Sequence, residues 1–73
     1  MNTHHVIDAR GLSCPEPALL AERALREGAE GRLEILVDTP TAVDNITRLA
    51  TRAGWAVLSE GEASGGTRLV LTR

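Results

Sequence analysis

The stretch Leu33-Glu34-Ile35-Leu36-Val37-Asp38-Thr39-Pro40-Thr41 passes from a strand pattern directly to the start of a helix. Leu33, Ile35 and Val37 alternate with their neighbours and would therefore project to the same side of a strand. That side must be covered by another layer, because burial of aliphatic side chains is what stabilises such a strand. The stretch predicts a strand of a covered sheet, followed at once by a helix.

The helix after this strand is predicted from its first turn and from one apolar stripe. Pro40 falls near the first turn, where a missing N–H has little cost. Thr41-x-x-Asp44 has the spacing of a capping box, although Thr39 is an alternative cap. Gly54 is placed to end the helix. The apolar stripe consists of Val43, Ile46, Leu49, Ala50 and Ala53.

The residues before Leu33 predict a strand, a loop and a first helix. His5-Val6-Ile7-Asp8-Ala9 is short and β-branched at its centre, which favours a strand. Gly11-Leu12-Ser13 follows as a loop, and a helix is predicted from Pro15 to about Glu27. Gly28 or Gly31 would end this helix in a left-handed conformation. The buried face of the helix would consist of Leu20, Ala21, Ala24, Leu25 and Gly28.

Two further strands complete the predicted fold. They run from Trp55 to about Glu60 and from Thr67 to Arg73, joined by a polar turn over residues 61–66. The order is strand, helix, strand, helix, strand, strand. Because each helix has only one buried stripe, both fit on the same face of the sheet. We predict an α/β two-layer sandwich, with two helices on one face of a four-stranded mixed sheet, as a single domain over residues 1–73.

Composition narrows the classes of function. The chain has 73 residues, 42% of them hydrophobic and 25% charged, as in a globular protein. Its eight basic residues are all arginine, which excludes a Schiff-base lysine mechanism. A net charge of −2 gives no general attraction for nucleic acid or anionic lipid, so neither is an expected partner. We find no targeting signal and no apolar run of about 20 residues, and a cytoplasmic location is expected.

Cys14 is the only cysteine, and it stands directly before two prolines in Gly11-Leu12-Ser13-Cys14-Pro15-Glu16-Pro17. If the helix begins at Pro15, Cys14 is its N-cap. The backbone N–H groups and the helix dipole would then favour the thiolate and lower the pKa of the thiol below about 8.5. Pro15 and Pro17 would stiffen this turn without loss of a helical hydrogen bond.

The surroundings of Cys14 admit two interpretations. The N–H groups of Glu16 and Ala18 would lie nearest the sulfur, and Arg10 would add a positive field that Glu16 opposes. A lone cysteine is also commonly an inert, buried small side chain. Because no second cysteine is present, the chain cannot close a disulfide of its own, and a reactive Cys14 would be suited to passing a group between proteins.

The sequence around Cys14 resembles the Cys-Pro-x-Pro signature region of the TusA/SirA/YedF family of small sulfur-carrier proteins. In Asp8-Ala9-Arg10-Gly11-Leu12-Ser13-Cys14-Pro15-Glu16-Pro17, the cysteine, both prolines, the Gly-Leu pair and the upstream aspartate all agree. Val37-Asp38-Thr39-Pro40-Thr41-Ala42-Val43-Asp44-Asn45-Ile46 resembles the start of the family's second helix. The resemblance covers essentially the whole chain and is closest to the YedF-like branch. It implies the same sandwich fold.

The resemblance also implies a function. Cys14 would accept sulfane sulfur as a persulfide from a cysteine desulfurase or rhodanese-like donor and pass it to an acceptor carrier protein. The pathway would be tRNA thiolation, molybdenum cofactor synthesis or sulfur oxidation. Such a sulfurtransferase-type carrier needs no cofactor and no metal, and whether it is an enzyme in its own right stays open. The supporting and partner-binding residues would be Arg10, Gly11, Pro15, Glu16 and Pro17.

Other functions stay open beside this one. YedF-like proteins often carry a second domain, and the motif does not separate sulfur from selenium. An RNA-binding module is an alternative, because the family's sandwich resembles the C-terminal domain of a bacterial translation initiation factor, although the negative net charge argues against it. A regulatory protein would instead bind partners through the Cys14 helix end without chemistry, and would tolerate Cys14→Ser.

The charged residues on the helices have simpler readings. Asp44–Arg48 and Glu22–Arg26 have the i,i+4 spacing of exposed ion pairs. Arg48 and Arg52 lie one turn apart, and they form either a solvated helix face or a contact for an acidic partner.

The remaining polar and aromatic residues are assigned structural roles. His4 and His5 point to opposite faces of a strand, which makes them unsuited to bind one metal ion. Asp8 would accept N–H bonds, either from the Cys14 loop or from its own local backbone. Trp55 is expected to anchor the edge of the core.

Overall fold

The structure is a computed structural model, and it describes residues 5–13, 15–27, 31–62 and 65–73. The order of elements predicted from the sequence is confirmed, and the bounds differ by a single residue where they differ. In chain order the elements are β1 (His5–Asp8), α1 (Glu16–Arg26), β2 (Arg32–Val37), α2 (Pro40–Arg52), β3 (Ala56–Gly61) and β4 (Thr67–Thr72).

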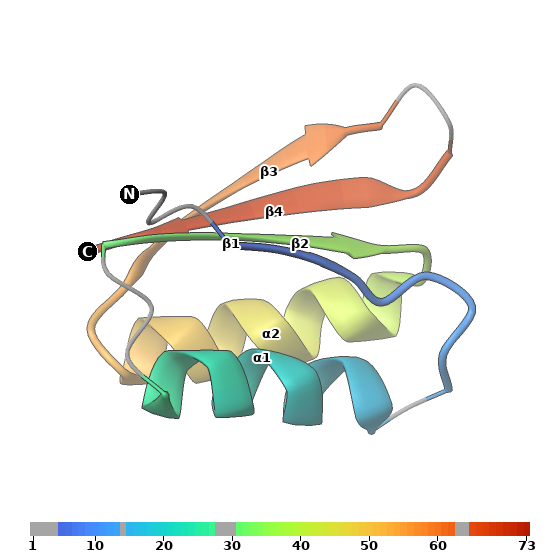
Figure 1. The fold of residues 1–73 in the computed structure, drawn as a ribbon. Coiled ribbons are helices and arrows are strands. Elements are labelled where there is room, and N and C mark those ends of the chain that lie inside the picture. The colour runs from blue at the N-terminus through green and yellow to red at the C-terminus, as the bar shows by residue number, and fades with distance from the viewer. Residues whose placement is uncertain (1–4, 14, 28–30, 63–64) are drawn as a thin grey trace.

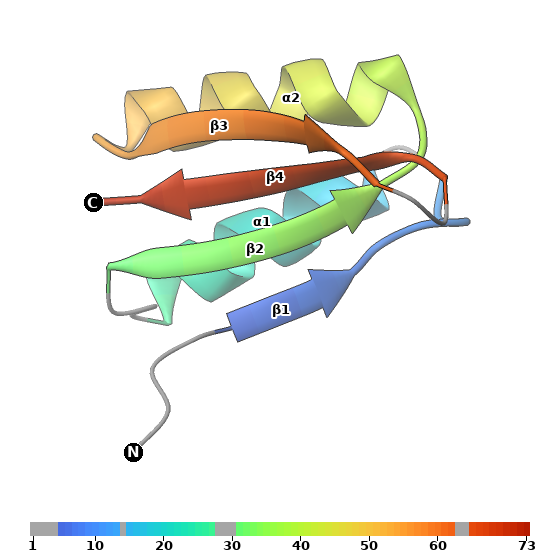
Figure 2. The same ribbon diagram turned by 90° about the horizontal axis from the view of Figure 1, so that it is seen from above.

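The four strands form one mixed sheet in the order β1-β2-β4-β3 (Figure 2). β1 runs parallel to β2, and β4 is antiparallel to both β2 and β3. The last strand of the chain therefore lies in the interior of the sheet. This position agrees with the continuous apolar run Leu69-Val70-Leu71, all three of which are buried.

Both helices cover the same face of the sheet, so the predicted two-layer sandwich is confirmed (Figure 1). Leu33, Ile35 and Val37 are completely buried beneath the helices, as their alternation indicated. Ala21 of α1 and Ile46 of α2 are buried against them. Burial of each large aliphatic side chain contributes about 1.5–3 kcal/mol, which is why one apolar stripe per helix is enough to hold the layers together.

The opposite face of the sheet has no helix over it, yet it holds a buried acid. Val6, Glu34, Val70 and Leu58 lie opposite one another on the four adjacent strands. Glu34 is only 4% exposed, and its carboxylate pairs with Arg32 at 3.2 Å and with Arg68 at 3.1 Å. The alternating pattern of β2 identified the covered face but not this ion-paired acid on the other one.

The start of α2 differs from the predicted capping box. Thr39 is the N-cap, because its Oγ1 accepts a hydrogen bond from the N–H of Ala42 at 3.2 Å. Pro40 is the first helical residue, as its position suggested. The Thr41-x-x-Asp44 box is wrong, since Thr41 already lies inside the first turn. Gly54 follows the helix with a φ of +90°, a left-handed conformation that glycine adopts without strain.

Several smaller predictions are also decided. The Glu22–Arg26 pair is present at 3.4 Å, whereas Asp44 and Arg48, although both are described, form no ion pair. Ala53, at the end of the predicted apolar stripe, is exposed. Trp55 is buried at the edge of the core as expected, and the Arg73 guanidinium lies 5.7 Å from its ring centroid.

The end of α1 is settled only in part. The helix ends at Arg26 with Glu27 as its C-cap, and Gly31, which has a φ of +85°, lies too far along the chain to end it. Gly28, the other predicted terminator, and His4 lie outside the described residues. No helix in the described part of the chain is both long and apolar enough to cross a bilayer.

Candidate functional site

The candidate site lies at the edge of the sheet where β1 and β2 end. Because these strands are parallel, the segments that follow them leave from the same edge, and both helices begin there (Figure 1). The N–H of Ala9, just beyond β1, still bonds the carbonyl of Leu36 at 2.8 Å. The loop that leads to Cys14 therefore starts from a firmly paired strand.

Asp38 connects this loop to the end of β2. Its Oδ2 accepts a hydrogen bond from the N–H of Gly11 at 2.8 Å. Gly11 has a φ of +81°, so a side chain at this position would add backbone strain to the turn. Asp38 was not among the site residues predicted from the sequence. It could have been predicted, because Asp38 directly follows β2 and the carboxyl ends of adjacent parallel strands meet at one edge of the sheet.

Asp8 and Arg10 form a local pair beside the loop. Asp8 Oδ1 accepts hydrogen bonds from Arg10 Nε at 2.9 Å and from the Arg10 backbone N–H at 3.1 Å, while Asp8 Oδ2 accepts one from Arg10 Nη2 at 2.9 Å. These bonds lower the pKa of Asp8 from 3.8 to about 2 and raise the pKa of Arg10. Of the two roles predicted for Asp8, the structure shows the one in which its carboxylate bonds to groups close by in the sequence. Because the Asp8 carboxylate neutralises much of the Arg10 charge, the positive field expected from Arg10 is weakened.

The start of α1 differs from the arrangement predicted around Cys14. The N-cap is Pro15 and the first helical residue is Glu16, so the assignment of Cys14 as N-cap is wrong. The N–H of Glu16 donates a hydrogen bond to the carbonyl of Ser13 at 2.9 Å. The sequence had predicted this N–H to be one of the two donors nearest the Cys14 sulfur, and the turn now uses it. Cys14 itself lies outside the described residues.

The two prolines of the motif have different surroundings. Pro17 is buried, where it anchors the first turn of α1. Pro15 and Glu16 are exposed, as are Gly11 and Ser13 on the other side of Cys14. The residues that flank the thiol along the chain are thus accessible to another protein. In the described part of the chain, no group of three or more potential metal ligands occurs.

The fold, together with the Cys-Pro-x-Pro sequence that leads into α1, is that of a class of small α/β domains. Comparison with known proteins assigns the family: the sequence model of the family named sulfurtransferase TusA matches residues 5–73, and the chain belongs to this family.

Individual relatives agree with this assignment. A candidate sulfur carrier protein of Methanocaldococcus jannaschii is 35% identical over 68 residues, which are 92% of this chain and 91% of that protein. The sulfur carrier protein TusA of Pseudomonas entomophila is 32% identical over 60 residues, 81% of this chain and 75% of that one. The crystal structure of a SirA-like protein from Desulfitobacterium hafniense superposes with a TM-score of 0.85 at 28% identity, covering 93% of this chain and 95% of that chain. The YedF-like branch stays a prediction.

Proposed function

We propose that this protein carries sulfane sulfur as a persulfide on Cys14, between a donor protein and an acceptor protein. The observation that supports this most directly is that a member of a sulfurtransferase family has a single cysteine, placed in the Cys-Pro-x-Pro segment. No other side chain in the sequence is a thiol. Relatives from both archaea and bacteria are named as sulfur carriers, which supports the same role.

The proposed transfer needs no redox cofactor. The Cys14 thiolate attacks the terminal sulfur of a donor persulfide, so a new S–S bond forms at Cys14 and the donor's S–S bond breaks. The donor leaves as a thiolate, and the transferred sulfur keeps its oxidation state. In the second step an acceptor thiolate attacks the terminal sulfur on Cys14, and the Cys14 thiolate leaves.

The neighbouring residues would position this sulfur rather than react with it. Pro17 anchors the start of α1, while Gly11 permits the turn that leads to Cys14. Pro15 and Glu16 are exposed and would contact the donor and the acceptor. Arg10 is held by Asp8, and we propose that it orders the loop, with only a reduced electrostatic effect on the thiolate.

The expected partners follow from the same chemistry. The donor would be a cysteine desulfurase or a rhodanese-like protein, and the acceptor another carrier protein in a sulfur relay. We further propose that residues 1–73 act as one carrier domain in the cytoplasm, where thiols stay reduced.

The test is the intact mass of the purified protein after incubation with a cysteine desulfurase and cysteine, or with a rhodanese and thiosulfate. We expect a gain of one sulfur atom that reductant reverses and Cys14→Ser abolishes. A control with the thiol moved by one position, Ser13→Cys in Cys14→Ser, should load poorly from either protein donor. No gain from any donor would refute the proposal, and a gain of selenium but not sulfur would reassign the cargo.

A further inference from the structure

Arg48 and Arg52 differ from the other arginines of the chain. All eight arginines lie within the described residues, and six of them have an ion-pair or aromatic-ring partner there. Arg48 and Arg52 have neither, although both are on the surface of α2. The arginines with partners are Arg10, Arg23, Arg26, Arg32, Arg68 and Arg73.

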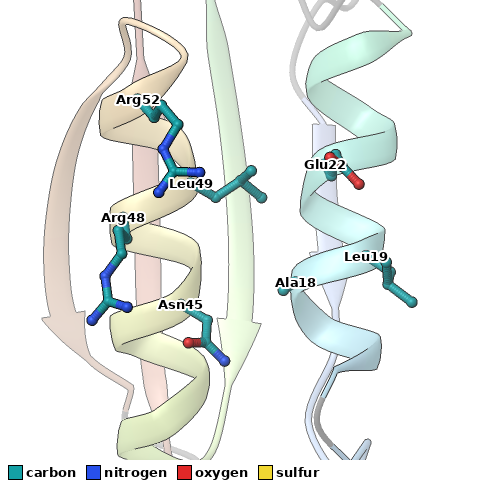
Figure 3. Close-up of a pocket in the computed structure, with 7 residues that line it drawn as sticks. All are labelled: Ala18, Leu19, Glu22, Asn45, Arg48, Leu49 and Arg52. Carbon is teal, nitrogen blue, oxygen red and sulfur yellow. The ribbon is translucent and has the colours of Figure 1, made fainter.

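These two arginines line a groove between the helices. They lie one turn apart on α2, and Ala18, Leu19 and Glu22 line the groove from the neighbouring helix α1. Figure 3 shows Ala18 directed toward α2, whereas Leu19 is directed away from α2 and the Arg48 guanidinium is directed away from α1. The groove has a volume of about 260 Å³. It lies on the helical side of the sandwich, away from the uncovered face of the sheet.

The groove also exposes an apolar side chain. Leu19, in the first turn of α1, is 54% exposed. Among the described residues that line the groove, the one acid is Glu22, which is already paired with Arg26 on its own helix at 3.4 Å. The carboxylate of Glu22 therefore does not neutralise Arg48 or Arg52.

We infer that this groove binds an acidic segment of a partner protein, with two carboxylates against Arg48 and Arg52 and an apolar side chain over Leu19. Two guanidinium groups one turn apart match two carboxylates with the same spacing, and each can form paired hydrogen bonds. Nucleic acid fits less well, because a phosphate backbone requires a longer row of cations than the two arginines among the described residues that line this groove.

The test uses fluorescence anisotropy of a labelled helical peptide that carries two glutamates one turn apart and a leucine between them. The same peptide with glutamines and a single-stranded RNA oligonucleotide are the comparison probes. All measurements are made on the full chain with Cys14→Ser, so that the result does not depend on sulfur transfer. The inference and the proposed function can then fail separately.

We expect saturable, salt-sensitive binding of the glutamate peptide that weakens about tenfold in Arg48→Gln/Arg52→Gln. The control Arg23→Gln removes an exposed arginine from α1 outside the groove and should change binding by less than about twofold. Leu19→Ser should weaken binding without altering its salt dependence.

Three results with the peptide probes would overturn the inference. They are the absence of saturable binding, equal affinity for the glutamine peptide, and unchanged affinity in the variant that lacks both arginines. Tighter binding of RNA through the same two arginines would also overturn it, and would assign the groove to a nucleic acid.

Discussion

Asp38→Ala removes the carboxylate that holds the Cys14 loop to the end of β2. The lost contact is the 2.8 Å hydrogen bond from the Gly11 N–H. A hydrogen bond to a charged acceptor contributes about 1.5–3 kcal/mol, but this one is solvent-exposed, which reduces the expected value to about 1 kcal/mol. A change of that size raises the equilibrium for local opening of the loop about fivefold.

The assay is the exchange rate of the Gly11 amide hydrogen, measured under conditions where the loop closes much faster than the open amide exchanges, so that the rate reports the opening equilibrium. We expect exchange to be about fivefold faster in Asp38→Ala, with slower loading of Cys14 by a protein donor. Asp38→Asn keeps an acceptor oxygen and should retain most of the protection. Asp44→Ala removes the same charge nearby and serves as the control. Unchanged Gly11 exchange in Asp38→Ala, or an equal acceleration in Asp44→Ala, would refute the reasoning.

Two further predictions concern stability. An alanine Cβ at Gly66 would clash with the carbonyl oxygen of Val37, whereas one at Gly65 would have no neighbour within 4 Å, and both glycines have positive φ. Gly66→Ala should therefore lower the free energy of unfolding in urea by about 1–3 kcal/mol more than Gly65→Ala does, and equal losses would contradict this. The folded-state pKa of Asp8 is lowered from 3.8 to about 2, so its contribution to stability is present above about pH 4 and is lost as the pH falls toward 2. Asp8→Asn should flatten the pH dependence of the unfolding free energy in this window, and an unchanged slope would show that the pair contributes nothing.

The segment of the chain that forms the candidate site could be predicted from the sequence, but the positions at which the two helices begin could not. Gly11, Pro15 and Pro17 were identified because the conformational freedom of glycine and the fixed φ of proline are local properties that the sequence records. The N-cap was predicted wrongly at α1 and left open between Thr39 and Thr41 at α2, because several residues at each helix start had suitable chemistry. At α2 the N-cap is Thr39, whose hydroxyl accepts a hydrogen bond from the N–H of Ala42. At α1 the turn from Ser13 moved the helix start by one residue.

The periodicity of apolar residues was enough to establish the elements, their order and the buried face of each, because alternation and helical spacing are properties of short segments. The position of β4 between β2 and β3 required the folded chain, since its register is set by partners from distant segments. The bond between Asp38 and Gly11 joins residues 27 positions apart, and the groove that contains Arg48 and Leu19 is formed by two different helices. Such contacts depend on how the layers pack, and no local pattern records that.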